Sequence, residues 1–352
     1  MKIIKVVFPL ALTFLFCISF FSCSKDDNPI APPVDTTYHF DSARYNWTVD
    51  ILFNFPWGNL YVPDTNNLYL ITDGNLLWKH GNTIDYIPLP FQCYGIDGLG
   101  NNSIYLAGSQ SYVGTKINVI RIFKYNGSTF TDLNFPTDTV ASQFKLNYVY
   151  TVSENEVWFA GYSNSRIYRY DGTEFHRYDL DSGFRPSSNF VKNTEGLFVQ
   201  TTKYFSNGSP DSIRIYKFDG TLFNPVYSVK INGSLITNYL MYNMDNYIFN
   251  IREDGIYKFT GGNFMKVVSS LPVNFYIDFG GKNQNDLLLR GYSGPRSDST
   301  NFLHWNGNKW SKEFPALYGT IGTLICNTSE KYYIAFYNGT KLFIYTGRPK
   351  NN

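Results

Sequence analysis

One short motif recurs along the chain and constrains its fold more than any other feature. It consists of an aromatic residue, a polar residue that is usually Asn or Asp, a Gly, and a second aromatic residue three positions later. The complete copies are Tyr125-Asn126-Gly127 with Phe130, Tyr170-Asp171-Gly172 with Phe175, Phe218-Asp219-Gly220 with Phe223, Phe259-Thr260-Gly261 with Phe264, and Trp305-Asn306-Gly307 with Trp310. A looser copy, Trp78-Lys79-His80-Gly81 with Ile84, comes first, and a truncated copy, Tyr345-Thr346-Gly347, comes last. The seven glycines are 46, 45, 48, 41, 46 and 40 residues apart, which is the length of one structural repeat.

The motif predicts a β-hairpin in every repeat. Asn-Gly and Asp-Gly favour tight type I′ turns, because both central residues of that turn need a positive φ, and the flanking aromatic residues pack across the two strands. In three repeats a second element, an Asn with a Gly six residues later, comes before the hairpin, at 102–108, 155–161 and 285–291. Each repeat therefore predicts four short antiparallel strands. In the third repeat these are 146–152, 156–161, 166–171 and 174–178.

The composition agrees with an all-β chain. The sequence has 36 Asn against 8 Ala, with 18% aromatic and only 16% charged residues. Ala, Glu and Lys fill helices, whereas aromatic residues prefer strands and Asn prefers turns. Seven repeats of four strands predict a seven-bladed β-propeller of four-stranded antiparallel blades in residues 38–352.

The two ends of the chain predict how the ring closes. After Gly347 only five residues remain, too few for an outermost strand in the last blade. The segment 44–49 has the pattern of a strand but no hairpin partner before it. We therefore expect this N-terminal strand to complete the last blade, which would leave no open sheet edge.

The first residues have the pattern of an export signal. Lys2 and Lys5 precede an apolar run at 6–21, and Ser22 lies before Cys23. Residues 1–22 are therefore predicted to be a signal peptide. The alternative, an uncleaved membrane anchor, would need about 20 apolar residues, and the run has 16.

The Phe20-Phe21-Ser22-Cys23 segment resembles the lipobox of bacterial lipoproteins. The resemblance implies that the Cys23 thiol is diacylated, and residues 23–37 would then form a tether stiffened by three prolines. The next residues, 24–27, resemble the acidic tag of lipoproteins displayed on the outer surface of some diderm bacteria. We expect an outer-membrane, surface-exposed protein, with the periplasmic leaflet as the alternative.

The charge of the chain without its signal peptide argues against nucleic acid as a partner. Removing residues 1–22 deletes two of 30 basic residues and none of 28 acidic ones, which leaves 28 of each. A chain of zero formal charge without basic runs has no electrostatic footprint for nucleic acid.

Cys93 and Cys326 fall in repeats that are not neighbours, so we expect free thiols. We expect a monomer.

The motif spacing also indicates a family resemblance. The Gly-His and Trp-Asp signature of WD40 repeats is missing. Residues 44–347 are instead similar to secreted bacterial propellers built on short Tyr-Asn-Gly or Trp-Asn-Gly hairpins, among them the sensor-type propellers of surface lipoproteins. Such propellers serve many functions, so the resemblance implies the architecture and little about activity.

Departures from the repeat indicate a functional face. The segment between the second-strand Gly and the hairpin Gly has 11 residues in the third repeat but 19 in the second and 16 in the sixth, and the fourth has an excess at 203–211. These insertions join second and third strands, so they emerge on one face together with the connections between blades. The connections carry the candidate ligand-binding residues Trp57, Phe184, Arg185 and Tyr318. The alternative is that these side chains cap the central channel.

Two functions remain open from the sequence. The first is a non-catalytic binding module for a glycan, peptide or protein. The second is a propeller hydrolase or lyase acting on polysaccharide, with carboxylates such as Asp138, Asp179 or Asp181, which would need two acids about 5 to 10 Å apart. The four histidines fit turn, strand or tether positions, so we expect no metal, no cofactor and no catalytic residue, and favour the binding module.

Overall fold

The computed structural model contains two compact units, Met1–Pro33 and Val34–Asn352. In the second unit it describes residues 36–38, 44–53, 57–72, 74–111, 118–136, 145–206, 208–231, 241–244, 247–252, 254–269, 271, 275–292, 300–314, 321–327, 330–337 and 341–350. No helix long and apolar enough to cross a membrane occurs among these residues. The predicted signal peptide and Cys23 lie outside the described residues.

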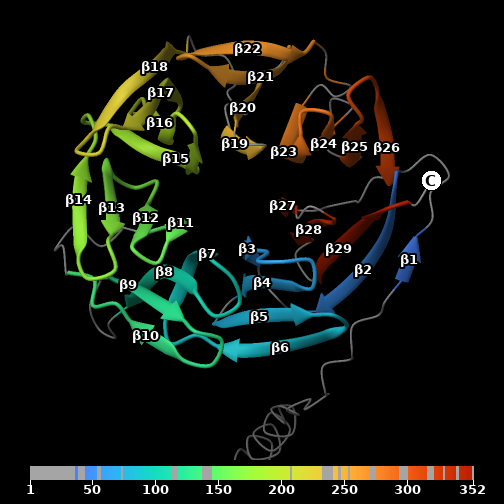
Figure 1. Cartoon of the computed structure of the whole chain (residues 1–352), viewed down its shortest axis with the longest axis horizontal. Coiled ribbons are helices and arrows are strands. Elements are labelled where there is room, and N and C mark those ends of the chain that lie inside the picture. The colour runs from blue at the N-terminus through green and yellow to red at the C-terminus, as the bar shows by residue number, and fades with distance from the viewer. Residues whose placement is uncertain are drawn as a thin grey trace, which may run out of the picture. The chain divides into compact units, whose positions relative to one another are not determined.

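The second unit is a ring of seven antiparallel sheets, each with its first strand innermost (Figure 1). Blades 1 to 3 are β3 (Trp57–Tyr61), β4 (Asn67–Thr72), β5 (Asn75–His80) and β6 (Thr83–Pro88); β7 (Gln92–Gly98), β8 (Ile104–Ser111), β9 (Asn118–Tyr125) and β10 (Phe130–Asp132); and β11 (Tyr148–Ser153), β12 (Glu156–Ala160), β13 (Arg166–Tyr170) and β14 (Phe175–Asp179). Blades 4 to 6 are β15 (Phe184–Asn193), β16 (Gly196–Tyr204), β17 (Pro210–Phe218) and β18 (Phe223–Lys230); β19 (Met241–Met244), β20 (Tyr247–Arg252), β21 (Gly255–Thr260) and β22 (Asn263–Val268); and β23 (Phe275–Asn283), β24 (Asp286–Tyr292), β25 (Thr300–Trp305) and β26 (Trp310–Phe314). Blade 7 is β27 (Ile321–Asn327), β28 (Tyr332–Tyr337), β29 (Lys341–Pro349) and β2 (Tyr45–Phe53), with β1 (Thr36–Tyr38) on its outer edge. The predicted all-β, seven-bladed propeller is confirmed, and the strands of blade 3 begin and end within two residues of their expected positions.

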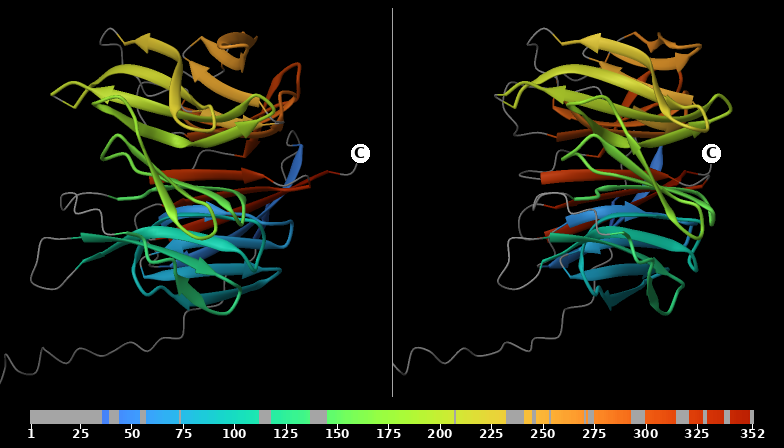
Figure 2. Two further views of the ribbon diagram at one scale, coloured as in Figure 1. Left: turned by 60° about the vertical axis from the view of Figure 1, so that its left-hand side comes forward. Right: turned by 90° about the vertical axis from the view of Figure 1, so that its left-hand side faces the viewer.

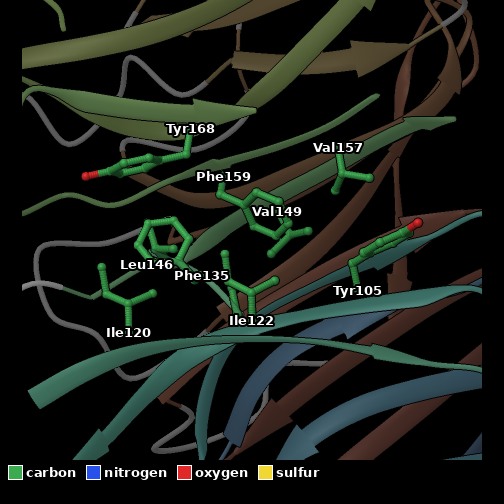
Figure 3. Close-up of a cluster of buried hydrophobic side chains, with 10 residues drawn as sticks. Tyr105, Ile120, Ile122, Phe135, Leu146, Val149, Val157, Phe159 and Tyr168 are labelled. Atoms are coloured by element: carbon green, nitrogen blue, oxygen red, sulfur yellow. The ribbon is translucent and has the colours of Figure 1, made fainter. Parts of the chain in front are cut away.

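Apolar side chains fill the space between neighbouring blades. Figure 3 shows one such cluster, in which Tyr105 and Ile122 from blade 2 meet Val149 and Phe159 from blade 3. The connection between the two blades adds Phe135 to the cluster. Burying a side chain such as that of Phe159, which is fully inaccessible, contributes about 2 to 3 kcal/mol. The blades therefore stabilise one another, as expected for a repeat architecture.

The repeated hairpins form as predicted, but most of their turns differ from the predicted type I′. In blades 2, 3, 4 and 6 the loop has four residues, and only its Gly has a positive φ. The preceding Asn or Asp stabilises the loop through its side chain: Asn306 Oδ1, for example, accepts hydrogen bonds from the backbone N–H groups of Asn308 and Lys309, both at 3.0 Å. In blade 5 the two-residue loop has positive φ at both Gly261 and Gly262, as type I′ requires. The motif thus selects a side-chain-capped loop wherever Asn or Asp precedes the Gly.

The N-terminal strand closes the ring. β2 pairs with β29 in an unbroken antiparallel register from Tyr45 opposite Pro349 to Phe53 opposite Lys341, and the two strands lie side by side in Figure 1. The predicted closure is therefore confirmed. Gly347, the seventh glycine of the repeat, lies within β29, where a Cβ would be 2.6 Å from the ring of Trp47. Gly347 therefore lets the Trp47 ring of β2 pack closely against β29, and it does not form a turn.

A buried carboxylate of blade 6 accepts hydrogen bonds from the beginning of β2. Glu313 in β26 is completely inaccessible to solvent. Its carboxylate accepts hydrogen bonds from the backbone N–H of Arg44 at 3.0 Å, from that of Tyr45 at 3.3 Å, and from Nε1 of Trp47 at 3.2 Å. The closing strand is therefore held by its backbone pairing with β29 and by the Glu313 carboxylate of blade 6.

A second buried carboxylate extends this network. Asp286 at the start of β24 accepts hydrogen bonds from the hydroxyls of Tyr45 at 2.8 Å and Tyr332 at 3.1 Å, and its Oδ1 lies 2.8 Å from His304 Nε2. These hydrogen bonds lower the pKa of Asp286 against the opposing effect of burial. The network links the N-terminal strand, blade 6 and blade 7.

The two faces of the ring carry different connections. Because strand direction alternates within each blade, the β8–β9, β16–β17 and β24–β25 connections emerge on one face, which we call the insertion face. The hairpin turns such as β5–β6 emerge on the opposite face, the turn face. Figure 2 shows the β8–β9 and β16–β17 hairpins extending on the side opposite the C-terminus. The inserted segments therefore share one face, as predicted from their position between second and third strands.

Cys93 is a free, buried thiol in β7, and burial raises its pKa. Cys326 belongs to β27, and its side chain is outside the described set. Blade 1 separates the two strands, in agreement with the expectation that the two cysteines fall in non-adjacent blades.

Candidate functional site

The four predicted ligand-binding residues have different outcomes. Trp57 is the first residue of β3, but its side chain is outside the described set, and Tyr318 lies outside the described residues altogether. Phe184 and Arg185 are the first two residues of β15, on the insertion face. Arg185 is exposed, whereas Phe184 is only 4% exposed. A ligand contact by any of the four remains a prediction.

The ring of Phe184 is covered by its neighbours. The Arg214 guanidinium lies 4.0 Å from the ring centroid, and the Lys203 ammonium lies 6.0 Å from it. The Tyr216 ring packs at an interplanar angle of 67° with a centroid distance of 6.4 Å. Phe184 therefore supports the basic side chains above it and offers no open stacking face.

The predicted catalytic carboxylates are engaged in ion pairs. Asp179 lies 2.9 Å from Nη2 of Arg177, and Asp181 pairs with Arg214. Asp181 also accepts a hydrogen bond from the Tyr216 hydroxyl at 2.9 Å. Asp138 lies outside the described residues. The two described acids are thus held by arginines on the surface.

Exposed aromatic side chains gather on the insertion face where blades 3 and 4 meet. Tyr162 in the β12–β13 connection is 50% exposed, and Tyr204 and Phe205 at the tip of the β16–β17 hairpin are 42% and 46% exposed. Tyr148 at the start of β11 is close to both tyrosines: burial raises its pKa to about 12, and the phenol groups of Tyr204 and Tyr162 add to that rise. We call these four residues the aromatic patch.

Basic side chains lie next to the aromatic patch. Lys203 precedes Tyr204 in β16, and Arg185 lies opposite Thr202 in the paired strand β15. Both Lys203 and Arg185 are exposed. Tyrosine together with arginine is the composition of binding hot spots, because both side chains combine a large contact area with hydrogen-bonding groups.

The sequence indicated this face but not these residues. The excess length at 203–211 marks the β16–β17 hairpin, yet an aromatic residue in an insertion can be buried or exposed. Tyr204 and Phe205 are exposed because β16 extends to Tyr204, so that the tip of the hairpin lies beyond the contacts between blades. That strand length follows from pairing with β17 and has no separate signal in the sequence.

One acidic group has a strongly raised pKa. Asp97 in β7 is partly buried, and desolvation raises its pKa to about 7, although the Thr151 backbone N–H donates a 2.6 Å hydrogen bond to Oδ2. Such a shift occurs at many active sites, but also at structural contacts between elements. The Thr151 contact joins the innermost strands of blades 2 and 3, so we assign Asp97 a structural role.

A three-residue cluster in blade 3 has side chains that could bind a metal. One ligand atom each from Asp171, Glu174 and His176 lies within 4.8 Å of the others, and His176 Nε2 is 2.7 Å from Asp171 Oδ2. In blade 4 the amide of Asn224 donates to Asp219 Oδ2 at the same distance, 2.7 Å. Because an amide replaces the imidazole in an equivalent hairpin, the contact belongs to the hairpin, and we assign no metal to it.

The remaining histidines also have structural partners. His80 lies 2.7 Å from Asp85 in the β5–β6 hairpin and packs at 4.2 Å from the Trp78 ring. His304 is buried against Asp286, and His39 lies outside the described residues.

Comparisons with known proteins concern the fold. No protein-family model and no curated protein matches the sequence. Among solved structures, the chain is similar to YCF48 bound to a D1 peptide, with a TM-score of 0.58 and 11% identity over 90% of this chain and 98% of that chain. It is also similar to the WD40 β-propeller domain of Doa1, with a TM-score of 0.54 and 8% identity over 90% of this chain and 97% of that one. At these identities the likeness shows the fold alone, and that fold is a β-propeller.

Proposed function

We propose that the protein is a non-catalytic binding module that holds a peptide segment of a protein partner against the aromatic patch. The observation that carries this proposal is the exposure of Tyr162, Tyr204 and Phe205, which keep 42 to 50% of their surface in solvent. Large apolar groups that gather at the surface of a folded unit are typical of interaction sites. Here they come from neighbouring blades, so a ligand lying across the patch would contact both.

The side chains around the aromatic patch favour a peptide over a sugar polymer. Sugar recognition relies on free polar groups that pair with hydroxyls, but Asp179 and Asp181 are already occupied by arginines. Arg185 and Lys203 would instead attract carbonyl oxygens or acidic side chains of a peptide. The structure of YCF48 bound to a D1 peptide is one example of a similar chain that holds a peptide.

We further propose that Cys23 carries a lipid that anchors the protein in the outer membrane, with the propeller exposed at the cell surface. The support is the lipobox-like sequence before Cys23 and the first strand at Thr36–Tyr38, which leaves a short tether between lipid and ring. Two or three acyl chains would make the attachment stable. Cys23→Ala should abolish metabolic labelling by an alkyne fatty acid, and a mutant that is still labelled would refute the anchor.

The test of the binding function uses the full-length protein in a non-ionic detergent and a displayed library of random peptides. Selected peptides should bind a Tyr162→Ala/Tyr204→Ala variant at least tenfold more weakly, since two exposed contacts worth about 1 kcal/mol or more each are removed. Met265→Ala, which removes a 60% exposed side chain from the outer strand β22, is the matched control. Equal binding to both variants, or ligands found only on a glycan array, would contradict the proposal.

A further inference from the structure

A small pocket lies on the turn face, between blade 7 and blade 1. It has a volume of about 80 Å³ and is bordered by the closing strand β2, the end of β29 and the β5–β6 turn. The seam where the two ends of the chain meet therefore has an opening on the face opposite the aromatic patch.

Three basic side chains line this pocket, against one carboxylate. They are Lys79, Lys331 and Arg348, and the carboxylate is Asp50. Lys79 and Asp50, each 9% exposed, form an ion pair of 2.9 Å, and Lys331 and Arg348 are the other basic residues of the lining. Arg348 is exposed, and no acidic side chain in the described part of the chain forms an ion pair with it.

Lys331 is held in place close to the other two basic groups. It is 9% exposed, and its ammonium donates a hydrogen bond to the carbonyl oxygen of Thr65. Burial lowers its pKa, and the positive charges of Arg348 and Lys79 lower it further, although Glu330 and Asp64 act in the opposite direction. Three basic groups therefore converge at this seam.

Hydroxyl groups complete the lining. Thr48, Thr346 and Tyr333 contribute side chains to the pocket, and the Tyr333 hydroxyl donates to the Thr65 carbonyl at 2.6 Å. The Thr346 hydroxyl can donate to an oxyanion beside the basic groups, whereas the single protons of the Thr48 and Tyr333 hydroxyls are given to carbonyl oxygens.

We propose that this pocket binds one phosphate or sulfate group, either as the free ion or as the end of a larger ester. The lining has three basic side chains and a single carboxylate, Asp50, which favours an anionic ligand. The volume is large enough for one tetrahedral oxyanion. The bound group would contact β2, β29 and blade 1, and would so stabilise the packing of blade 7 against blade 1.

The test is isothermal titration calorimetry of the full-length protein in a non-ionic detergent, with inorganic phosphate, sulfate and glycerol 3-phosphate as probes. Sodium chloride keeps the ionic strength constant, because these anions also stabilise proteins without binding to a site. Arg348→Gln removes a charge at the rim of the pocket. Lys309→Gln removes the same charge from the exposed β25–β26 turn on the same face and is the matched control.

The expected result is saturable binding of one phosphate or sulfate, weakened at least tenfold by Arg348→Gln and changed less than twofold by Lys309→Gln. Binding of glycerol 3-phosphate as well would identify an ester group as the ligand, whereas its failure to bind would restrict the pocket to the free ion. No saturable heat with any probe, or equal weakening by both variants, would overturn the proposal. The aromatic patch is unchanged in both variants, so the two proposals are tested separately.

Discussion

At the scale of single residues, one acid at the contact between blades 2 and 3 has a raised pKa. Asp97 is a strand residue between Ile96 and Gly98, and neither neighbour marks it in the sequence as unusual. Its raised pKa arises from the packing of blade 2 against blade 3, which sequence patterns do not describe. Sequence patterns do not mark Glu313 either, because its hydrogen-bond partners lie more than 260 residues away in the sequence.

The raised pKa of Asp97 predicts a pH-dependent contribution to stability. Between about pH 4 and pH 7 the folded protein retains a proton that the unfolded chain has lost, so this residue lowers the free energy of unfolding as the pH rises through that window. Asn stays neutral and still accepts the hydrogen bond from Thr151. Asp97→Asn should therefore be more stable than the natural protein at pH 8, by up to about 4 kcal/mol, and close to it at pH 4.

Urea unfolding of the two proteins at several pH values measures this difference. A stability difference that is the same at pH 4 and pH 8 would show that Asp97 does not titrate in this window.

At the scale of elements, the sequence predicted the strands well and the turns less well. The glycine spacing located the outer hairpins of blades 1 to 6, and the short tail after Gly347 indicated that strand 44–49 completes the last blade. The type I′ turns were wrong in four blades because Asn and Asp have two ways to shape a loop: through a positive φ or through their side-chain oxygen. Asn126 uses the second, and accepts hydrogen bonds from Ser128 and Thr129.

Substitution of Glu313 tests whether its carboxylate stabilises the closing strand β2. Glu313→Ala would remove the carboxylate that accepts hydrogen bonds from three N–H groups, which should lower the free energy of unfolding by about 3 kcal/mol. Glu313→Gln keeps one acceptor oxygen and should lose less. Hydrogen exchange followed by mass spectrometry should show faster exchange in Tyr45–Phe53 for the Ala variant.

Exchange that is unchanged in Tyr45–Phe53 but faster elsewhere would show that this strand does not depend on the carboxylate.

At the scale of the whole unit, the ring separates two surfaces. The insertion face carries the aromatic patch, and the turn face carries the basic pocket at the seam. The sequence predicted the ring and the inserted face because both follow from chain length and repeat spacing. It could not identify the aromatic patch, because exposure of Tyr162 and Tyr204 depends on how far two hairpins of different blades extend.

The most direct measurement of the central claim is photo-crosslinking in cells that produce the protein. A benzoylphenylalanine placed at position 204 should form a covalent adduct with a protein partner. The yield of this adduct should fall when Tyr162→Ala is added. The same photoreactive group at position 265, on the outer strand β22, should form none. Adducts from position 265 and none from position 204 would contradict recognition by the aromatic patch.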